Sequence, residues 1–489
     1  MLRFDTQIKI SEYKKLYEII IPQNNILRKI KENIDFSFVN PMLKESYCEK
    51  FGRPAKEPEL MFKILFLKKM YDLSDESLIQ NIAVNMAYKY FLDLDPEDDT
   101  VNPSLLTKFR KTRITEDILE EMLKETVNQA IKKGLIKSRA IIVDATHSKS
   151  SAKHETPTQI LRRYTKELRK EIYTTQFEFS KNFPEKPVET ADLNDEINYS
   201  NQLVENLKKD IENSGTKKAK DLLERVVTLL GNDKIREIQS SVDEDAKLGH
   251  KSEANSFFGY KSHLAMTEER IITGIEVTTG EASDGVYLEK LIEQSEKNGI
   301  QIDEVIADTA YSGSNNLELA KTKEIKMISK LHPIISNGNG LQKEGFVFNK
   351  DADMFQCPSG HLSIKKSISK KDKKHQESDR ITYLFDIKTC KNCPIKENCY
   401  IEGQKSKSYS VRILSDIHKE QKEFQETEYF KIKAKKRYMI EAKNAELKIS
   451  HGLENADSVG VIAMRLQTYF TVFAVNIKRI VKLLEVEPV

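Results

Sequence analysis

The chain has 489 residues, of which 39% are hydrophobic and 32% are charged, and the charges nearly cancel to a formal net charge of +3. This length suits two to four domains, and the apolar content is enough to build a core, so we expect a soluble globular protein. Because the charges balance, affinity for a polyanion must come from local basic patches rather than from the field of the whole protein.

Neither a signal peptide nor a membrane span is expected. The N-terminal stretch MLRFDTQIKISEYKK lacks an apolar core, and no run approaches the ~18 to 20 apolar residues that a span requires. The closest stretch, residues 458–484, contains Arg465, Gln467 and Asn476. We interpret it as a buried core helix in a cytoplasmic protein.

Residues from about 26 to 135 have a helical pattern. Within 57–94 two helices are joined by a short turn, with Ser74 as the expected N-cap, which is typical of a helix-turn-helix. Residues 102–134 continue with helices and carry Lys108, Arg110, Lys111 and Arg113. The region is either a DNA-reading domain or a small helical bundle with a solvated basic edge.

The periodicity changes to that of β-strands near residue 138. Stretches rich in β-branched residues predict strands, and a helix is expected before the last of them. The expected strands lie within 139–148, 256–268, 270–280 and 303–311, and the helix within 283–299. The pattern predicts an α/β fold, with an α+β mixed sheet that carries helices on its faces.

Two segments interrupt this sheet. Residues 155–239 read as a charged helical hairpin, whose charges form either a solvated face or a contact with DNA or a partner. Residues 336–410 open with the turn-rich SNGNG and contain a cysteine cluster and the basic stretch KKSISKKDKKH, which is either a DNA-backbone contact or a solvated tip. Helical segments follow to the end of the chain.

Two aspartates end apolar strands in the same way, Asp144 after AIIV and Asp308 after EVIA. A carboxylate in this place is held by rigid backbone and can present oxygen to a metal ion. The alternative for each one alone is an ordinary turn former or helix N-cap. His147, three residues after Asp144, either contacts the metal or a phosphate or is a surface residue. Asp284 is expected to cap the next helix.

A third carboxylate lies on the helix expected around residues 431–452. At 3.6 residues per turn, one stripe carries Arg437, Glu441, Asn444 and Lys448. The alternative is an exposed helix face on which Arg437 and Glu441 form an i,i+4 ion pair. Together the three carboxylates would form an oxygen-rich pocket for Mg²⁺ or Mn²⁺, and two such ions can cleave a phosphodiester.

This order of motifs resembles the RNase H-like core of DDE transposases of bacterial insertion sequences, specifically the insertion-sequence "four" and "eleven-eighty-two" type group. Their Y-x2-R-x3-E-x6-K signature is matched by Arg437, Glu441 and Lys448, whereas the tyrosine position is Ala434. Further stretches resemble the family in the same order along the chain, namely 38–71, 100–111, 241–269 and 306–313.

The resemblance implies that Asp144, Asp308 and Glu441 are catalytic metal ligands, and that Arg437 and Lys448 contact DNA. Further candidates for lining the site or binding DNA are Tyr260, Lys261, His263 and Arg110. The implied activity is metal-dependent DNA strand cleavage and strand transfer by a homodimer on double-stranded DNA, with terminal inverted repeats and target DNA as substrates. It would act at the bacterial nucleoid.

The resemblance and the composition together give a set of expected domains. They are a helical N-terminal DNA-binding domain (1–135), an RNase H-like core (136–154 and 240–335), a helical insertion (155–239), a cysteine-rich zinc-ribbon-like insertion (336–410) and C-terminal helices that complete the core (411–489).

Four of the five cysteines crowd into one region, and Cys48 stands apart. Cys357, Cys390, Cys393 and Cys399 could supply four thiolates to a structural Zn²⁺, with an iron-sulfur cluster or free reduced thiols as alternatives. A closed site of this kind leaves no position open for catalysis.

Two other functions remain compatible with the sequence. One is a nuclease of RNase H-like fold that does not transpose. The other is a DNA-binding protein without enzymatic activity, whose acidic residues are structural.

Overall fold

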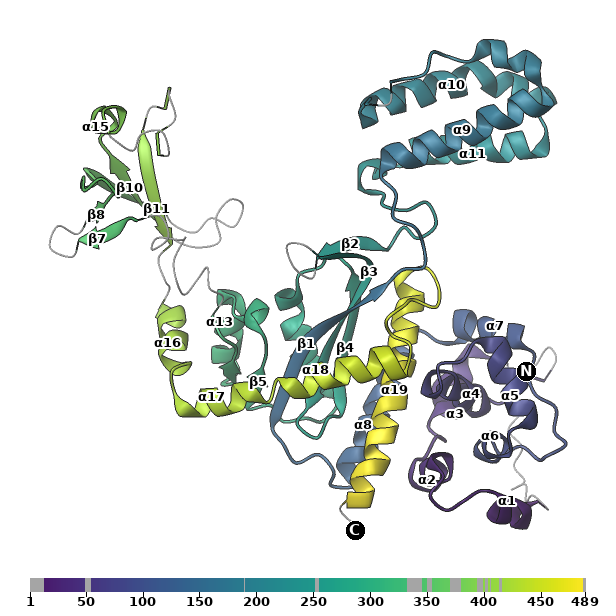
Figure 1. Ribbon diagram of the computed structural model, residues 1–489. Helices are drawn as coiled ribbons and strands as arrows, with labels where there is room; N and C mark the ends of the chain where they lie inside the picture. The colour runs from purple at the N-terminus through teal and green to yellow at the C-terminus, as the bar shows by residue number, and fades with distance from the viewer. Residues whose placement is uncertain are drawn as a thin grey trace.

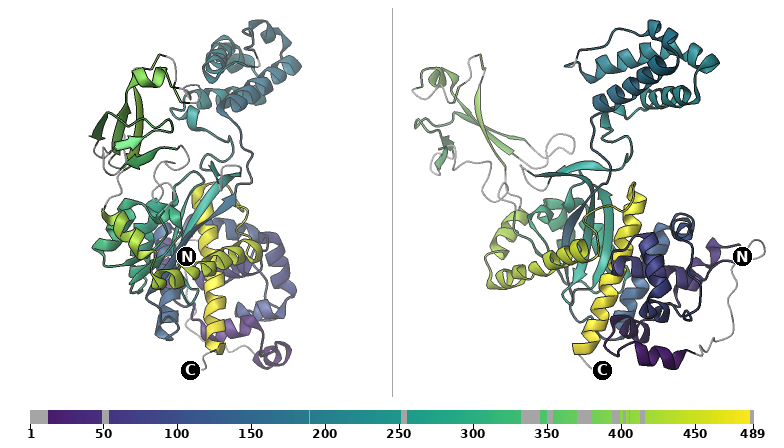
Figure 2. Two further views of the ribbon diagram at one scale, coloured as in Figure 1. Left: turned by 60° about the vertical axis from the view of Figure 1, so that its left-hand side comes forward. Right: turned by 45° about the vertical axis from the view of Figure 1, so that its right-hand side comes forward.

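The computed structural model describes residues 13–48, 54–188, 190–250, 255–331, 345–349, 354–369, 380–393, 399–400, 403–404, 406–412 and 416–486. Within these ranges the chain has a helical N-terminal region packed beside one mixed sheet (Figure 1). Two smaller bodies project from the sheet, a group of three helices and a small β-module (Figures 1 and 2). The predicted α/β class and the helical N-terminal region are confirmed.

The N-terminal region contains eight α-helices among its described residues. They are α1 Lys14–Ile20, α2 Ile26–Asn33, α3 Val39–Leu43, α4 Pro58–Met70, α5 Asp75–Val84, α6 Met86–Phe91, α7 Pro103–Arg113 and α8 Glu116–Lys132. Ser74 caps α5 as predicted, because its side chain accepts the backbone N–H of Ser77 at 3.1 Å. The single helix expected after it is instead two, since Asn85 accepts the N–H groups of Ala87 and Tyr88 and starts a new helix.

The main sheet has six described strands: β1 Ala140–Lys149, β2 Lys247–His250, β3 Ser256–Thr267, β4 Ile272–Thr279, β5 Glu304–Ile306 and β6 Lys326–Ile328. β3 is antiparallel to β1, β2 and β4, whereas β1, β5 and β6 run parallel to one another. The core strands therefore follow the order β4-β3-β1-β5-β6, and β2 extends the edge beside the first half of β3.

Strand β1 fills nearly the whole of the stretch 139–148 that was expected to contain it. The expectation that Asp144 ends the strand is wrong, because residues 145–149 continue to pair with β3 as far as Gly259. Buried polar side chains lie in this second half of the strand. Ser148 is fully buried, yet its hydroxyl donates to the carbonyl of Leu453 at 2.5 Å.

The long helix α19 (Val461–Val486) joins the two halves of the molecule. It packs on α4 and α8 of the N-terminal region and on β4 of the sheet. As predicted it is a buried helix, and the polar Asn476 bonds both the N–H and the carbonyl of Ile272. No helix in the described parts of the chain is long and apolar enough to cross a membrane.

The insertion between β1 and β2 is a bundle of three helices rather than the expected hairpin. The helices are α9 Pro157–Thr175, α10 Leu193–Ser214 and α11 Lys217–Leu230. Leu168, Leu203 and Leu223 belong to a separate apolar core that the three helices share. The bundle projects away from the sheet (Figure 1).

The cysteine-bearing segment forms the small β-module. Its elements are β7 Val347–Asn349, β8 Met354–Gln356, β9 Lys365–Ser369, β10 Arg380–Phe385, α15 Ile387–Lys391 and β11 Lys407–Arg412. Phe355, Tyr383, Phe385 and Tyr409 form its core. The SNGNG turn and most of the basic stretch that follows β8 lie outside the described residues.

The remaining described helices surround the sheet. They are α12 Leu288–Lys297, α13 Ser314–Thr322, α16 Asp416–Phe424, α17 Glu428–Lys435 and α18 Tyr438–Ala445. α12 packs on β4, and α18 crosses β1. This places the helix expected to carry the third carboxylate over the strand that carries the first.

Candidate active site

The register of two parallel strands brings Asp144 and Asp308 together. Ile142 of β1 pairs with Ile306 of β5. Asp144 and Asp308 each lie two residues beyond that pair, and side chains two residues apart point to the same face of a sheet. The two carboxylates therefore lie close together, Asp144 within β1 and Asp308 two residues after the end of β5.

The surroundings of the two aspartates oppose their ionisation. Burial raises the pKa of Asp144 to about 7, with Arg437 acting to lower it and Asp308 adding to the rise. Burial also raises the pKa of Asp308, although its carboxylate accepts the N–H of Ala310 at 2.9 Å. Because burial and mutual repulsion disfavour the charged forms of these two carboxylates, a bound cation would stabilise those charged forms.

Helix α18 brings its polar face to this pair. The side-chain amide of Asn444 donates to Asp144 at 2.9 Å, and the other amide atom, Oδ1, is buried with no partner found among the described residues. Arg437 lies one turn before Glu441 and binds it at 2.6 Å. The charge of the same guanidinium acts to lower the pKa of both aspartates, against the larger effect of burial. The predicted stripe of Arg437, Glu441 and Asn444 thus faces the site.

Glu441 lies at the edge of the site rather than inside it. Its side chain is 54% exposed and is paired with Arg437. Among the described residues, no three His, Cys, Asp or Glu side chains converge closely enough to form a metal site. In this arrangement two aspartates form the centre, and the glutamate lies one helical turn from the asparagine that touches them.

Lys448 lies where the type of helix changes. α18 continues into a π-helical turn, Glu446–Ser450, which widens the helix and shifts Lys448 from the stripe that a regular helix predicts. The Lys448 ammonium lies 3.3 Å from both ring nitrogens of His147, whose ring stacks near Phe257. The lysine and the histidine of the predicted set therefore meet each other.

Asp284 belongs to the site, and its predicted role as a helix cap is wrong. It is the first residue of the 3₁₀ turn Asp284–Tyr287, where Ser283 occupies the cap position and no side chain caps the turn. Its carboxylate binds the Lys261 ammonium at 2.9 Å, and its charge adds to the pKa rise of both Asp144 and Asp308. Asparagine and aspartate at such positions favour turns in general, which is why the sequence suggested a cap.

Backbone packing holds Asp284 next to Asp308. The Asn316 side chain donates to the carbonyl of Gly285 at 2.8 Å and to that of Tyr311 at 3.1 Å. A Cβ on Gly285 would lie only 2.6 Å from the carbonyl oxygen of Ala310, so glycine permits this close approach. The turn after β4 and the turn after β5 are thus locked together.

Two buried aromatic groups complete the pocket. The Tyr311 hydroxyl is fully buried, feels the charges of Asp284, Asp144 and Asp308, and has no partner found in the described chain. His263 stacks on Tyr287, and burial lowers its pKa to about 4, so it is neutral at physiological pH. Sequence reasoning gave no role to Tyr311; its place three residues after Asp308 was the available signal.

The donor set fits a hard divalent cation. Mg²⁺ and Mn²⁺ favour carboxylate oxygens, and Mg²⁺ usually keeps several waters and needs only one or two protein carboxylates besides substrate phosphate. Asp144 and Asp308 supply such oxygens, and the orphaned oxygen of Asn444 and hydroxyl of Tyr311 supply further polar atoms at the same place. His263 uses Nε2 on Thr278 at 3.0 Å, whereas its buried Nδ1 has no hydrogen-bond partner among the described residues and lies 3.9 Å from Asp284.

Other predicted residues have partners elsewhere in the fold. Arg110 forms a two-pronged ion pair with Asp75 of α5, which uses its guanidinium within the N-terminal region. Tyr260 donates to Asp243 at 2.5 Å, away from the carboxylates. Lys261 lies at the site through Asp284. A DNA contact by Arg110 or Lys261 remains a prediction.

The four clustered cysteines line one pocket of the β-module. The pocket has a volume of about 200 Å³ and is lined by Cys357, Cys390, Cys393 and Cys399, with His361 beside them. Burial raises the pKa of the Cys390 thiol, and the other three sulfurs add to the rise. The four thiols thus line one pocket, but in the described part of the chain they do not lie close enough together to form a metal site, and zinc binding stays a prediction.

An N-terminal segment and a C-terminal segment of the chain each match a known protein family. Residues 15–112 match a transposase domain (DUF772), and residues 356–481 match a transposase DDE domain. Both matched segments are therefore transposase domains, the second of the DDE type. The predicted family is thereby confirmed, and the second match contains Glu441, Arg437 and Lys448.

A curated relative adds a more limited likeness. The uncharacterized protein ORF8 in the nfe locus of Rhizobium meliloti is 30% identical to this chain over 114 residues. The match covers 22% of the chain and 55% of that protein, so the chain spans about half the length of the relative.

Proposed function

We propose that the chain cleaves DNA strands at the ends of an insertion sequence and joins the freed 3′-hydroxyl to target DNA, using Mg²⁺ or Mn²⁺. The observation that carries the proposal is the register that sets Asp144 beside Asp308 at equal offsets on parallel strands. The matches to a transposase domain and to a transposase DDE domain support the same reaction.

The strand order supports an RNase H-like core. Three parallel strands, β1, β5 and β6, are flanked on one side by the antiparallel strands β3 and β4. In this arrangement the carboxyl ends of the central parallel strands, where Asp308 lies, face the helix that carries Glu441. We propose Asp144, Asp308 and Glu441 as the ligands, with Glu441 completing the set when its pairing with Arg437 is exchanged.

Each side chain of the site has its own role in the proposed reaction. A bound divalent cation supplies charge that polarises the phosphodiester and makes water or a 3′-hydroxyl a better nucleophile. Asp144 and Asp308 bind the cation, and the Asn444 amide holds the carboxylate of Asp144 in place. Arg437 is placed to take a phosphate oxygen once Glu441 turns toward the cation.

DNA is the proposed partner. We propose that Lys448, whose ammonium lies 3.3 Å from the ring of His147, contacts the backbone beside the cut. The N-terminal helices are the proposed reader of the terminal repeats, and the complex is proposed to contain two copies of the chain acting in the bacterial cytoplasm at the nucleoid. A structural Zn²⁺ on the four cysteines belongs to the same proposal.

The test is strand cleavage on DNA that carries the sequences flanking the reading frame. We expect Mg²⁺-dependent nicks at the element ends with the wild type and none with Asp144→Asn or Asp308→Asn. Asp303→Asn is the matched control, because Asp303 lies just before β5, is exposed and pairs with Arg139. Cleavage that survives in both site variants would refute the proposal, and cleavage without strand transfer would favour the nuclease.

A further inference from the structure

The chain after the π-helical turn forms a loop, residues 451–460, which we name the docking loop. It leads from the catalytic helix α18 to α19. Its residues extend the sheet beside the end of β1: the N–H of Lys149 donates to the carbonyl of Glu454, and the N–H of Ala456 donates to the carbonyl of Lys149, both at 2.8 Å. The docking loop is therefore hydrogen-bonded to β1 at Lys149, five residues beyond Asp144.

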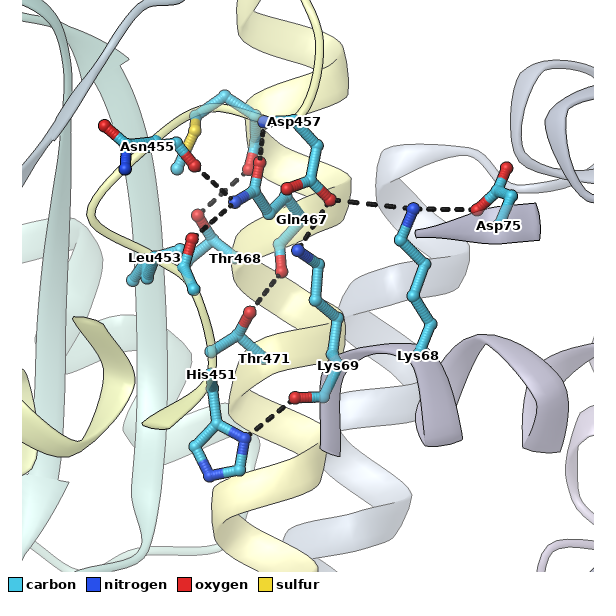
Figure 3. Close-up of polar contacts among 12 residues, drawn as sticks. Lys68, Lys69, Asp75, His451, Leu453, Asn455, Asp457, Gln467, Thr468 and Thr471 are labelled. Carbon is cyan, nitrogen blue, oxygen red and sulfur yellow. Dashed lines mark hydrogen bonds and ion pairs between the residues drawn. The ribbon is translucent and has the colours of Figure 1, made fainter. Parts of the chain in front are cut away.

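The docking loop is also fixed to both of the helices that it connects. The N–H of Leu453 donates to the carbonyl of Leu447 in the π-helical turn at 3.0 Å. The side chain of Gln467 on α19 accepts the N–H of Asp457 and donates to the carbonyls of Gly452 and Asn455 (Figure 3). A displacement of the loop would thus move the end of the catalytic helix.

The docking loop also contacts the N-terminal region, through both the side chain and the backbone of Lys69 on α4. The Lys69 ammonium binds Asp457 at 2.6 Å, and the backbone carbonyl of Lys69 accepts from Nδ1 of His451 at 2.8 Å (Figure 3). Lys68 lies 3.8 Å from the same Asp457 and binds Asp75 at 2.7 Å. Residues almost 400 positions apart in sequence are joined here.

Gly452 of the docking loop lies against the side chain of Asp72 in the turn between α4 and α5. Gly452 has a φ of +69°, and a Cβ at this position would lie 2.0 Å from Oδ1 of Asp72. Asp72 itself has a positive φ of 48°, which is uncommon for a residue other than glycine. The loop and the turn are therefore in close contact at this point.

The Lys69 ammonium is well suited to lock this contact. Its side chain is only 4% exposed, and burial lowers its pKa while Asp457 acts in the opposite direction. A buried charge whose partner is removed is left uncompensated, so the pair resists separation. Lys69 contacts none of the carboxylates of the proposed active site in the described structure, so its effect on the reaction must pass through the docking loop.

We propose that Lys69 and Asp457 form a latch through which the N-terminal helical region positions the catalytic helix, which makes Lys69 a positioning residue for DNA cleavage. The inference rests on the proposed function. It assigns the N-terminal region a second task besides reading DNA, namely holding Glu441 and Asn444 at the aspartates.

The test compares two buried lysines of the same helix. Lys69→Met removes the ammonium of the latch and keeps its aliphatic stem. Lys63→Met is the matched control, because Lys63 is similarly buried on α4 but pairs with Glu59 and Asp93 of the N-terminal region itself. Asp457→Asn breaks the latch from its more exposed side and covers the case in which Lys69→Met does not fold.

Hydrogen exchange of the peptide 447–457 is the first readout, since it does not require activity. We expect faster exchange of this peptide in Lys69→Met and Asp457→Asn and wild-type exchange in Lys63→Met. The second readout is single-turnover cleavage of the element-end DNA with saturating DNA and Mg²⁺. A small misplacement of reacting groups lowers rates on the order of 100-fold, so we expect a loss of that size in both latch variants with unchanged DNA affinity.

The outcomes separate the latch from the proposed function. Wild-type exchange and wild-type cleavage in Lys69→Met would overturn the latch, as would equal effects of Lys63→Met. A wild-type chain that cleaves no DNA would overturn the proposed function, and exchange of 447–457 alone would then decide whether Lys69 holds the loop.

Discussion

Replacing Asp144 with asparagine is expected to stabilise the fold while it removes a carboxylate that the proposed reaction needs. Asparagine has nearly the same shape and can still accept the Asn444 amide that now donates to Asp144 at 2.9 Å. The substitution therefore changes charge more than packing. Its effect on stability should come from the environment that opposes ionisation of this carboxylate.

The direction and size of the effect follow from the pKa of Asp144. Burial raises that pKa from 3.8 to about 7. Between these two pH values the folded state binds more protons than the unfolded state, so the free energy of unfolding falls as pH rises, and the loss is complete above about pH 7. At 1.36 kcal/mol per pKa unit, the cost of the charge is at most about 4 kcal/mol.

Urea denaturation without divalent ions measures this difference. We expect Asp144→Asn to be more stable than the wild type at about pH 8 and the gain to shrink toward about pH 5. The control is Asp303→Asn, where the carboxylate is exposed and pairs with Arg139, so no such gain is expected. A gain that does not grow with pH, or a less stable variant at the higher pH, would refute the reasoning.

Three further predictions concern other parts of the fold. Gly452→Ala should cost about the same roughly 1–2 kcal/mol of a left-handed alanine as Gly134→Ala at a similar φ, because its Cβ would meet at 2.0 Å only the end of the exposed Asp72 side chain, which can turn aside; a much larger loss in urea denaturation for Gly452→Ala would contradict this. Arg437→Ala removes the cation that lowers the pKa of both site aspartates, so the pH–rate profile of cleavage should move to higher pH, and an unmoved profile would exclude this role. Cys390→Ser should lower the zinc content of the purified chain in elemental analysis, and equal zinc in wild type and variant would argue against a four-thiolate site.

Much of the main sheet and its two aspartates could be predicted, because the residue patterns that indicate them lie within short stretches of the sequence. Runs of β-branched residues identified β1, β3, β4 and β5 of the main sheet, and an aspartate after the apolar part of a run marked Asp144 and Asp308. The short strands β2 and β6 were not predicted. The sequence also could not show that Ser148 of β1 is buried, since its hydroxyl reaches Leu453, about 300 residues further along the chain.

Features that depend on tertiary packing could not be predicted. The π-helical turn that redirects Lys448 has no marker in residue periodicity, which assumes a constant number of residues per turn. Asp284 has the local environment of a helix cap, and only the packing of its turn against the turn after β5 brings it to the site. The pairing of Lys69 with Asp457 joins two polar residues that each read as solvated.

The most direct test of the central claim is the metal preference of cysteine variants at the two aspartates. A thiolate is a softer ligand than a carboxylate and binds Mn²⁺ better than Mg²⁺. If Asp144 and Asp308 hold the cation, Asp144→Cys and Asp308→Cys should lose cleavage of element-end DNA in Mg²⁺ and regain part of it in Mn²⁺, while Asp303→Cys should remain active in both. Full activity of the first two variants in Mg²⁺ would contradict the account.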